Sequence, residues 1–252
     1  MSGTRNLGCV EFAVPGITLQ EKLIFLRRRK MWLEVANDGT KTIGEVLDSL
    51  KTTGGRVLSV QAYRLHDFQP LSGDRAEARA AVEHIAETMK MASEVGASNV
   101  VTTVTYGSPG IQNAMSRCVG LFRRLGKQAE DLGVAIGLEP LGRNRTTFLP
   151  GLRDVVDLVR RVGLDSVRPM ADTMHIYGNG DPVADILKEN LDLLSEVQLR
   201  DTDSRPPGSG GIDFREVVRL LTRYRGLVCL EYRPGPDPVG DFERAVRAVG
   251  RR

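Results

Sequence analysis

The sequence predicts a single α/β domain, residues 1–252, folded as a closed (β/α)8 barrel, also called a TIM barrel. The length of 252 residues is typical of this class. Short apolar strand patterns alternate with amphipathic helical patterns along the whole chain. In the second half, four strand patterns spaced by about 30 residues each carry an oxygen-bearing side chain at or near their carboxyl end. In a barrel of this class, the active site lies at the carboxyl ends of the strands.

The first half of the chain contains four expected strand–helix units. Two Thr-x-x-Glu capping boxes, Thr18 with Glu21 and Thr42 with Glu45, are expected to start the first two helices. Gly96 is expected to end the third helix. Strands are expected at 7–13, 31–36, 56–65 and 98–105, and helices at 22–30, 42–51, 73–95 and 111–132.

The second half contains four more such units. Asp181 and Pro182 are expected as the N-cap and first residue of the sixth helix. An open, doubly wound sheet would show the same alternation. However, the strands are uniformly short and no glycine-rich nucleotide motif follows the first one, so the closed barrel is favoured. Strands are expected at 134–139, 167–172, 196–201 and 227–231, and helices at 151–162, from 181, at 214–224 and from 240.

The composition limits the class of protein and the partners that it can have. Hydrophobic residues make up 41% and charged residues 27%, which supports a large core and argues against disorder. A net charge of +3 without a concentrated basic face predicts no nucleic-acid partner. No apolar run is long enough for a membrane span and no signal-like segment is seen. The three cysteines (Cys9, Cys118 and Cys229) lack CxxC spacing, which predicts reduced thiols in a cytoplasmic protein.

Four oxygen-bearing side chains are candidates for a metal site. If their strands are parallel neighbours, Glu139, Asp172, Gln198 and Glu231 converge on one point. An all-oxygen set suits Mn²⁺ or Mg²⁺ best, with Co²⁺ or Zn²⁺ as further options. The alternative is that each carboxylate caps a helix or pairs with an arginine.

The three histidines have different expected roles. His175, three residues after Asp172, is expected in a loop over the mouth of the barrel, where it would contact substrate. His66 follows the third strand and is a candidate for the same pocket. His84 lies in the middle of a helical pattern and is expected to be structural.

Four motifs in order carry a family resemblance: LEPL (138–141), ADTMH (171–175), EVQLRDTDSRPPGSGGIDF (196–214) and LEYRP (230–234). In this order and spacing the chain resembles the sugar isomerase/epimerase superfamily of xylose isomerase-like barrels. That group includes hydroxypyruvate isomerases and ketose 3-epimerases. The resemblance covers essentially the whole chain and is strongest from Glu139 onward.

The resemblance implies a metal-dependent isomerase or epimerase for sugars or hydroxy-keto acids. The divalent ion would be held by Glu139, Asp172, Gln198 and Glu231. Glu139 and Glu231 would act as acid and base in proton transfer through an enediolate. The resemblance also assigns substrate contacts to His175 and Arg205, although Arg205 lies one residue later than the family pattern.

The loop after the fifth strand departs from the family pattern. Gly142 and Arg145 stand where family members often carry Asn and a second Glu. A positive group in place of a negative one suggests an acidic or phosphorylated substrate, with Arg143 or Arg145 as its counter-charge. The alternative is that both arginines face solvent.

Other functions stay open on the same residues. A polyol dehydratase could use the same metal and carboxylates, and a barrel that binds a sugar or metal without catalysis could keep them. Family 2 apurinic endonucleases share the barrel but need more histidine ligands than three histidines supply. Members of the group often associate, so a homo-oligomer is compatible with the resemblance.

Overall fold

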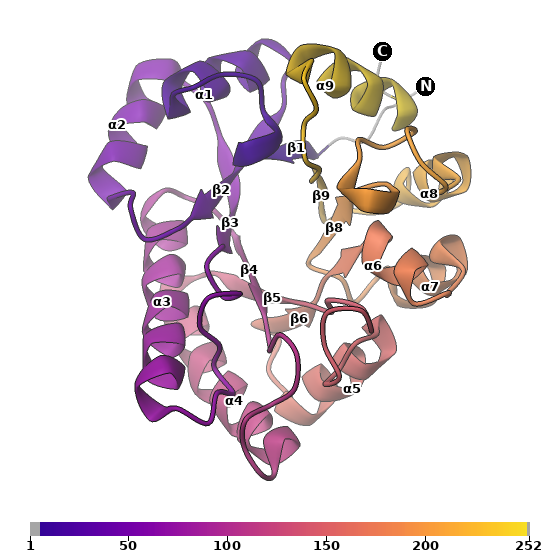
Figure 1. Ribbon diagram of the computed structural model, residues 1–252. Helices are drawn as coiled ribbons and strands as arrows, with labels where there is room; N and C mark the ends of the chain where they lie inside the picture. The colour runs from indigo at the N-terminus through magenta and orange to yellow at the C-terminus, as the bar shows by residue number, and fades with distance from the viewer. Residues whose placement is uncertain (1–5, 251–252) are drawn as a thin grey trace.

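Nine parallel strands form a barrel surrounded by helices in the computed structural model, which describes residues 6–250 (Figure 1). The strands are β1 (Leu7–Val10), β2 (Trp32–Asn37), β3 (Val57–Ala62), β4 (Asn99–Thr103), β5 (Ala135–Glu139), β6 (Val167–Pro169), β7 (Ala171–Asp172), β8 (Glu196–Leu199) and β9 (Leu227–Leu230). The α-helices are α1 (Leu19–Arg28), α2 (Ile43–Thr53), α3 (Arg75–Glu94), α4 (Ala114–Leu132), α5 (Leu152–Val162), α6 (Thr173–Gly178), α7 (Val183–Asn190), α8 (Phe214–Leu221) and α9 (Pro238–Ala248). Two short 3-10 helices are η1 (Glu11–Ala13) and η2 (Thr202–Ser204).

The sheet closes on itself. Its order is β6-β5-β4-β3-β2-β1-β9-β8-β7, and every neighbouring pair is parallel. The strands at the two ends of this order, β6 and β7, are separated only by Met170, whose N–H donates to the carbonyl of Leu138 at 3.0 Å. They are therefore two pieces of the expected strand 167–172, and the predicted closed barrel is confirmed.

The helix starts follow the local sequence. Thr18 and Glu21 form a reciprocal capping box before α1, and Thr42 with Glu45 forms another before α2, as expected. Each box satisfies backbone N–H groups that have no partner inside the helix. Gly96 follows the C-cap of α3 with a φ of +76°, a left-handed conformation that glycine adopts without a steric penalty.

Two neighbouring strands make a close contact in the core. Trp32 of β2 is fully buried, and its indole N–H donates to the carbonyl of Asn6 at 2.9 Å. Its Cα partner across the sheet is Gly8 of β1. A Cβ atom on Gly8 would lie 2.3 Å from the Trp32 ring, so only glycine leaves room for the indole.

Three local expectations are corrected. The first strand ends at Val10 because η1 follows it, and the N-cap of α7 is Pro182 rather than Asp181. His175 lies in the short helix α6, not in a loop, because helix α6 begins directly after β7. Asp172 causes this early start, since its side chain accepts hydrogen bonds from the backbone N–H groups of Met174 and His175.

Two further findings bear on the sequence predictions. All three cysteines are free and buried, as expected for reduced thiols. Within residues 6–250, no helix combines the length and apolar character that a membrane crossing requires.

Candidate active site

Three carboxylates and one arginine gather at the carboxyl end of the barrel. Glu139 is the last residue of β5 and Asp172 the last of β7. Arg200 directly follows β8, and Glu231 directly follows β9. Parallel strands bring their carboxyl ends to the same rim, and all four side chains are buried there.

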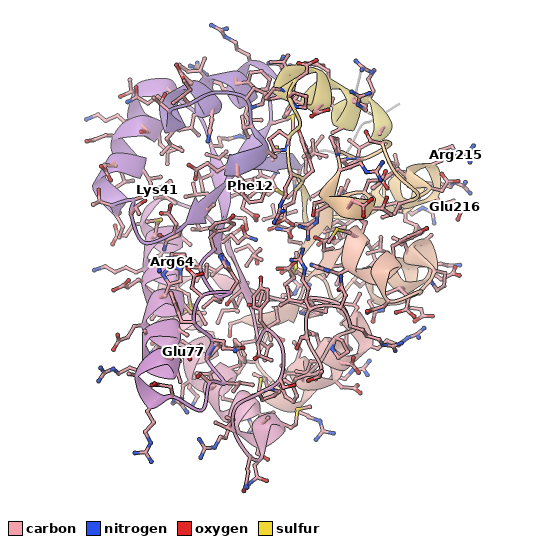
Figure 2. All side chains as sticks on the ribbon, in the orientation of Figure 1. Phe12, Lys41, Arg64, Glu77, Arg215 and Glu216 are labelled. Carbon is pink, nitrogen blue, oxygen red and sulfur yellow. The ribbon has the colours of Figure 1, made fainter. Side chains whose placement is uncertain are left out.

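A cavity of about 610 Å³ opens at this rim. Glu139, Arg200 and Glu231 are its buried charged members. Figure 2 shows Phe12, another lining residue, on the inner side of the ring of elements, whereas Arg215 on α8 lies on the outer side. The complete lining is Phe12, Gln61, Ala62, Tyr63, Leu65, His66, Val101, Thr102, Thr103, Tyr106, Glu139, Leu141, Arg145, Arg200, Glu231, Arg233 and Pro234.

Arg200 lies at the centre of the charged group. Its Nη2 atom donates to Oδ2 of Asp172 and lies 3.4 Å from Oε2 of Glu231. The same nitrogen lies 4.0 Å from Oε1 of Glu139 and 3.2 Å from Nε2 of His175. One guanidinium thus neutralises part of the charge of three buried carboxylates, the arrangement left open above as the alternative to a metal.

The shared arginine does not neutralise all three acids. Burial raises the pKa of Glu231 to about 7, with the Asp172 carboxylate adding to the shift and Arg200 opposing it. Burial and the charges of Glu231 and Asp172 raise the pKa of Glu139 well above its ordinary range. Burial alone would raise the pKa of Asp172, but the charge and the hydrogen bond of Arg200 lower it below its ordinary value. Asp172 is therefore the ionised partner of Arg200, while Glu139 and Glu231 hold protons more readily.

Arg200 itself stays charged. Burial alone would lower the pKa of Arg200, but the carboxylates of Asp172, Glu231 and Glu139 raise it above its ordinary value. Its backbone is held by Thr173, whose hydroxyl accepts from the Arg200 N–H at 2.9 Å and donates to the Arg200 carbonyl at 2.7 Å.

Gln198 is buried beside this group but turns toward a second one. Its Nε2 donates to Oε1 of Glu34 at 2.8 Å, and its Oε1 has no hydrogen-bond partner among the described residues. Glu34 lies near Glu196, whose Oε2 accepts from Asn99 at 2.9 Å. Burial raises the pKa of both acids, and the charge of Glu196 adds to the rise for Glu34. This interior pair is therefore kept at least partly protonated.

Both histidines that were candidates for substrate contact, His175 and His66, lie near the cavity. His175 is buried, and its Nε2 lies 3.5 Å from Oε1 of Glu139. Burial lowers the pKa of His175 to about 4, so the ring is neutral at ordinary pH. His66 lines the cavity mouth, half-exposed, with Nε2 at 3.4 Å from Oδ1 of Asp67. His84 is buried in α3 and packs edge-to-face against Phe68, as expected for a structural residue.

The arginines divide between the cavity and the surface. Arg145 lines the cavity and Arg143 is exposed, so of the two arginines considered as a counter-charge only Arg145 borders this cavity. The structure does not bring Arg205 to the cavity lining, because its guanidinium is held outside by Asp203 at 2.5 Å and by the Ser209 carbonyl at 3.2 Å. Arg233 lines the cavity in its place.

Sequence reasoning missed Arg200 and Arg233. Each lies two residues after a candidate ligand, Arg200 after Gln198 and Arg233 after Glu231. Side chains two positions apart on a strand point to the same face. The spacing was a usable signal, although both residues lie beyond the last residue of their strands, where strand geometry is no longer guaranteed.

The donor set at the rim fits a divalent cation. One donor atom from each of Glu139, Asp172 and His175 lies within 4.8 Å of the others. Carboxylate oxygens at this spacing match hard divalent ions, and an imidazole nitrogen adds affinity for Mn²⁺, Co²⁺ or Zn²⁺. The unpartnered Oε1 of buried Gln198 is a further oxygen without a protein donor. Glu34, Glu196 and Cys229 form a second group with ligand spacing deeper in the barrel.

Comparison with known proteins identifies the family to which the chain is similar. The model of the xylose isomerase-like TIM barrel family matches residues 24–249. D-psicose 3-epimerase of Enterocloster bolteae is 29% identical over 122 residues, which are 48% of this chain and only 40% of that protein. The 3-dehydro-D-guloside 4-epimerase of Escherichia coli is 27% identical over 206 residues, 76% of this chain and 77% of the relative. Among solved structures, apo 3-keto-D-glucoside 4-epimerase from E. coli superposes with a TM-score of 0.84 at 23% identity, covering 97% of this chain and 98% of that one.

Proposed function

Because this chain belongs to the xylose isomerase-like TIM barrel family, we propose that it is an isomerase or epimerase. It would remove a proton from the carbon atom next to a carbonyl group and return a proton to the same or the neighbouring carbon. The substrate would be a sugar or a hydroxy-keto acid. The matched relatives are named as sugar epimerases, which supports this reaction class.

The observation that carries the proposal is the placement of Glu139 and Glu231. Both are buried, and both line the same cavity. In the sheet order they are separated by β6 to β8 on one side and by β1 to β4 on the other, so they approach a bound substrate from different directions. Two carboxylates placed in this way can exchange a proton with one carbon atom as base and acid.

The electrostatics support the same roles. In the metal-free site the pKa of Glu231 is about 7 and that of Glu139 is raised, mainly by burial in both cases. An acid–base catalyst is most effective when its pKa is near the working pH. Arg200 also lines the cavity, so its guanidinium can stabilise negative charge that develops on a substrate oxygen.

Glu139, Asp172 and Glu231 would hold a divalent ion in this site. The side-chain oxygen Oε1 of Gln198 is the fourth ligand expected from the sequence. His175 is an additional donor, since its Nε2 lies 3.5 Å from Glu139. Bound Mn²⁺ or Mg²⁺, or Co²⁺ or Zn²⁺ in their place, would act as a Lewis acid that polarises the substrate carbonyl.

We further propose that the substrate carries a carboxylate or phosphate group. Arg145 and Arg233 line the same cavity as Glu139 and Glu231, and no salt bridge to either arginine side chain is found in residues 6–250. A negative substrate group would give these guanidinium groups a partner. His66 at the cavity mouth would be a further hydrogen-bond donor to the same substrate.

A substrate screen in D₂O tests the proposal. Hydroxypyruvate, ketoses, 3-keto sugars and their phosphates would each be incubated with the protein and Mn²⁺, Mg²⁺ or Co²⁺. We expect one class to exchange a C–H proton for deuterium, as seen by NMR, and to yield an isomer. Chelation should abolish the exchange. Glu83→Gln, at an exposed carboxylate on α3, is the matched control and should keep full activity.

Product analysis distinguishes an isomerase from a dehydratase and from a binding protein without catalysis. Loss of water from a cyclic polyol would identify a dehydratase that uses the same carboxylates. Tight sugar or metal binding without deuterium exchange for any substrate would identify a binding protein. Either outcome would refute the isomerase assignment.

A further inference from the structure

One nitrogen of Arg200 occupies the point on which the rim carboxylates converge. Nη2 contacts Oδ2 of Asp172 and lies 3.4 Å from Oε2 of Glu231 and 4.0 Å from Oε1 of Glu139. It also lies 3.2 Å from Nε2 of His175. A positive charge of the protein's own thus occupies the centre of a group of potential metal ligands.

Three of these residues offer donor atoms at the spacing that a metal ion needs. One ligand atom each of Glu139, Asp172 and His175 lies within 4.8 Å of the other two. An ion bound to these atoms would sit roughly 2.0 to 2.6 Å from each oxygen. That position coincides with the space around Nη2 of Arg200, so a divalent cation and the guanidinium would overlap and repel each other.

The contacts that hold the Arg200 side chain in this position are made by a single atom. Within residues 6–250, all hydrogen bonds and ion pairs of the Arg200 side chain are made by Nη2, and its buried Nε has no hydrogen-bond partner. The residue borders the 610 Å³ cavity, which offers space for the displaced guanidinium. Thr173 holds the Arg200 backbone on both sides, so a rotation of the side chain would suffice.

We propose that Arg200 and a divalent cation compete for one position among Glu139, Asp172 and Glu231. Without metal, the guanidinium fills this position and keeps the carboxylates together. When the ion binds, the guanidinium moves into the cavity, where it faces the substrate. Arg200 is thereby a positioning residue that links occupation of the metal site to the charge presented to the substrate.

This inference rests on the proposed function only in placing a divalent ion at the rim. Its test uses metal alone, so a failed substrate screen would leave it standing. Conversely, substrate turnover with an arginine that does not respond to metal would overturn this inference and not the function.

The first experiment measures metal affinity. Protein freed of metal with chelator would be titrated with Mn²⁺ by calorimetry, and free Mn²⁺ followed by electron paramagnetic resonance. We expect Arg200→Met to bind Mn²⁺ at least ten-fold more tightly than the unchanged protein, because the competing charge is gone. We also expect the variant to have a lower melting temperature without metal and to recover most of the loss at saturating Mn²⁺.

A matched control separates this effect from the general loss of a positive charge. Arg215 is 88% exposed in its side chain and lies on α8, on the outer side of the barrel (Figure 2). Arg215→Met should change neither the Mn²⁺ affinity nor the response of the melting temperature to metal. Equal or weaker Mn²⁺ binding by Arg200→Met, or no binding by either protein, would overturn the proposal.

A second experiment uses the unchanged protein and does not depend on a variant that folds. Phenylglyoxal modifies exposed arginines, and mass spectrometry of the digested protein reports the extent at each residue. Arg200 is 6% exposed, so we expect slow modification without metal and at least three-fold faster modification with saturating Mn²⁺. The rate at Arg215 should not change. An unchanged or slower rate at Arg200 would contradict displacement.

Discussion

Thr173 and Arg200 hold each other by two buried hydrogen bonds. The backbone N–H of Arg200 donates to Oγ1 of Thr173 at 2.9 Å, and that hydroxyl donates to the Arg200 carbonyl at 2.7 Å. Thr173 is the first residue of α6 and Arg200 the first after β8, so the pair joins two elements of the active-site rim. One hydroxyl therefore satisfies the backbone at the point from which the central guanidinium projects.

Replacing Thr173 tests this joint. Thr173→Val keeps the shape but leaves a buried N–H and a buried carbonyl without partners, each costing about 1 to 3 kcal/mol. We expect a loss of roughly 2 to 4 kcal/mol in the free energy of unfolding, measured by urea denaturation. Thr173→Ser keeps the hydroxyl and should lose clearly less. Similar losses in both variants would show that the methyl group, not the hydroxyl, stabilises the site.

The proposed acid–base pair gives a direct prediction on activity. Glu139→Gln and Glu231→Gln remove the ability to take up or release the proton, so turnover should fall by about 10²- to 10⁴-fold in each. Circular dichroism should show an unchanged fold. Steady-state kinetics and deuterium exchange measure the effect, and undiminished exchange in either variant would remove that residue from the mechanism.

The raised pKa of Glu231 predicts a pH-dependent stability in the metal-free protein. Burial raises this pKa from 4.5 to about 7, so between these values the folded protein binds a proton that the unfolded chain releases. The resulting stabilisation is complete below about pH 4.5 and is lost as the pH rises through about 7. Its full size is about 3 kcal/mol.

Unfolding by urea at pH 5.5 and pH 8.0, with chelator present, would measure this contribution. Other groups also titrate in this range, so the comparison is between the unchanged protein and Glu231→Gln. We expect the unchanged protein to lose more stability on going to pH 8.0 than the variant does. Equal pH dependence in the two would contradict a raised pKa at Glu231.

Arg145 in the cavity lining predicts that the enzyme prefers anionic substrates to neutral ones. Removal of a charge-assisted contact by Arg145→Ala should raise KM for an anionic substrate by about ten-fold or more, and should affect its neutral analogue much less. Arg143→Ala is the matched control, because Arg143 is exposed and does not line the cavity. If both variants changed KM equally, or if neither did, the negative substrate group would not bind at Arg145.

The contact between Gly8 and Trp32 predicts a packing effect far from the chemistry. A methyl group on Gly8 would meet the indole at 2.3 Å, so Gly8→Ala should lower the free energy of unfolding by about 1 to 3 kcal/mol. Gly120 lies within α4 and would meet nothing within 4 Å, so Gly120→Ala should be neutral or stabilising by up to about 1 kcal/mol. Thermal and urea unfolding would compare the two, and a stable Gly8→Ala protein would show that the ring can shift.

The sequence was most informative where local chemistry decides the structure. The capping boxes of Thr18 with Glu21 and Thr42 with Glu45 were predicted correctly because each involves residues only three apart. It was less informative around Asp172. Reading this residue as the end of a strand was correct, but its side chain also caps the next helix, which moved His175 from the expected loop into α6.

The sequence by itself determined the closed barrel, the family, and the gathering of Glu139, Asp172 and Glu231 at one rim. These follow from the alternation of strand and helix patterns and from the position of each residue at a strand end. Only the tertiary structure decided that Arg200 lies at their centre, that Gln198 turns to Glu34, and that Arg205 stays outside the cavity. The reason is physical: a buried side chain takes the orientation in which its charge or hydrogen-bonding groups find partners, and those partners come from strands distant in sequence.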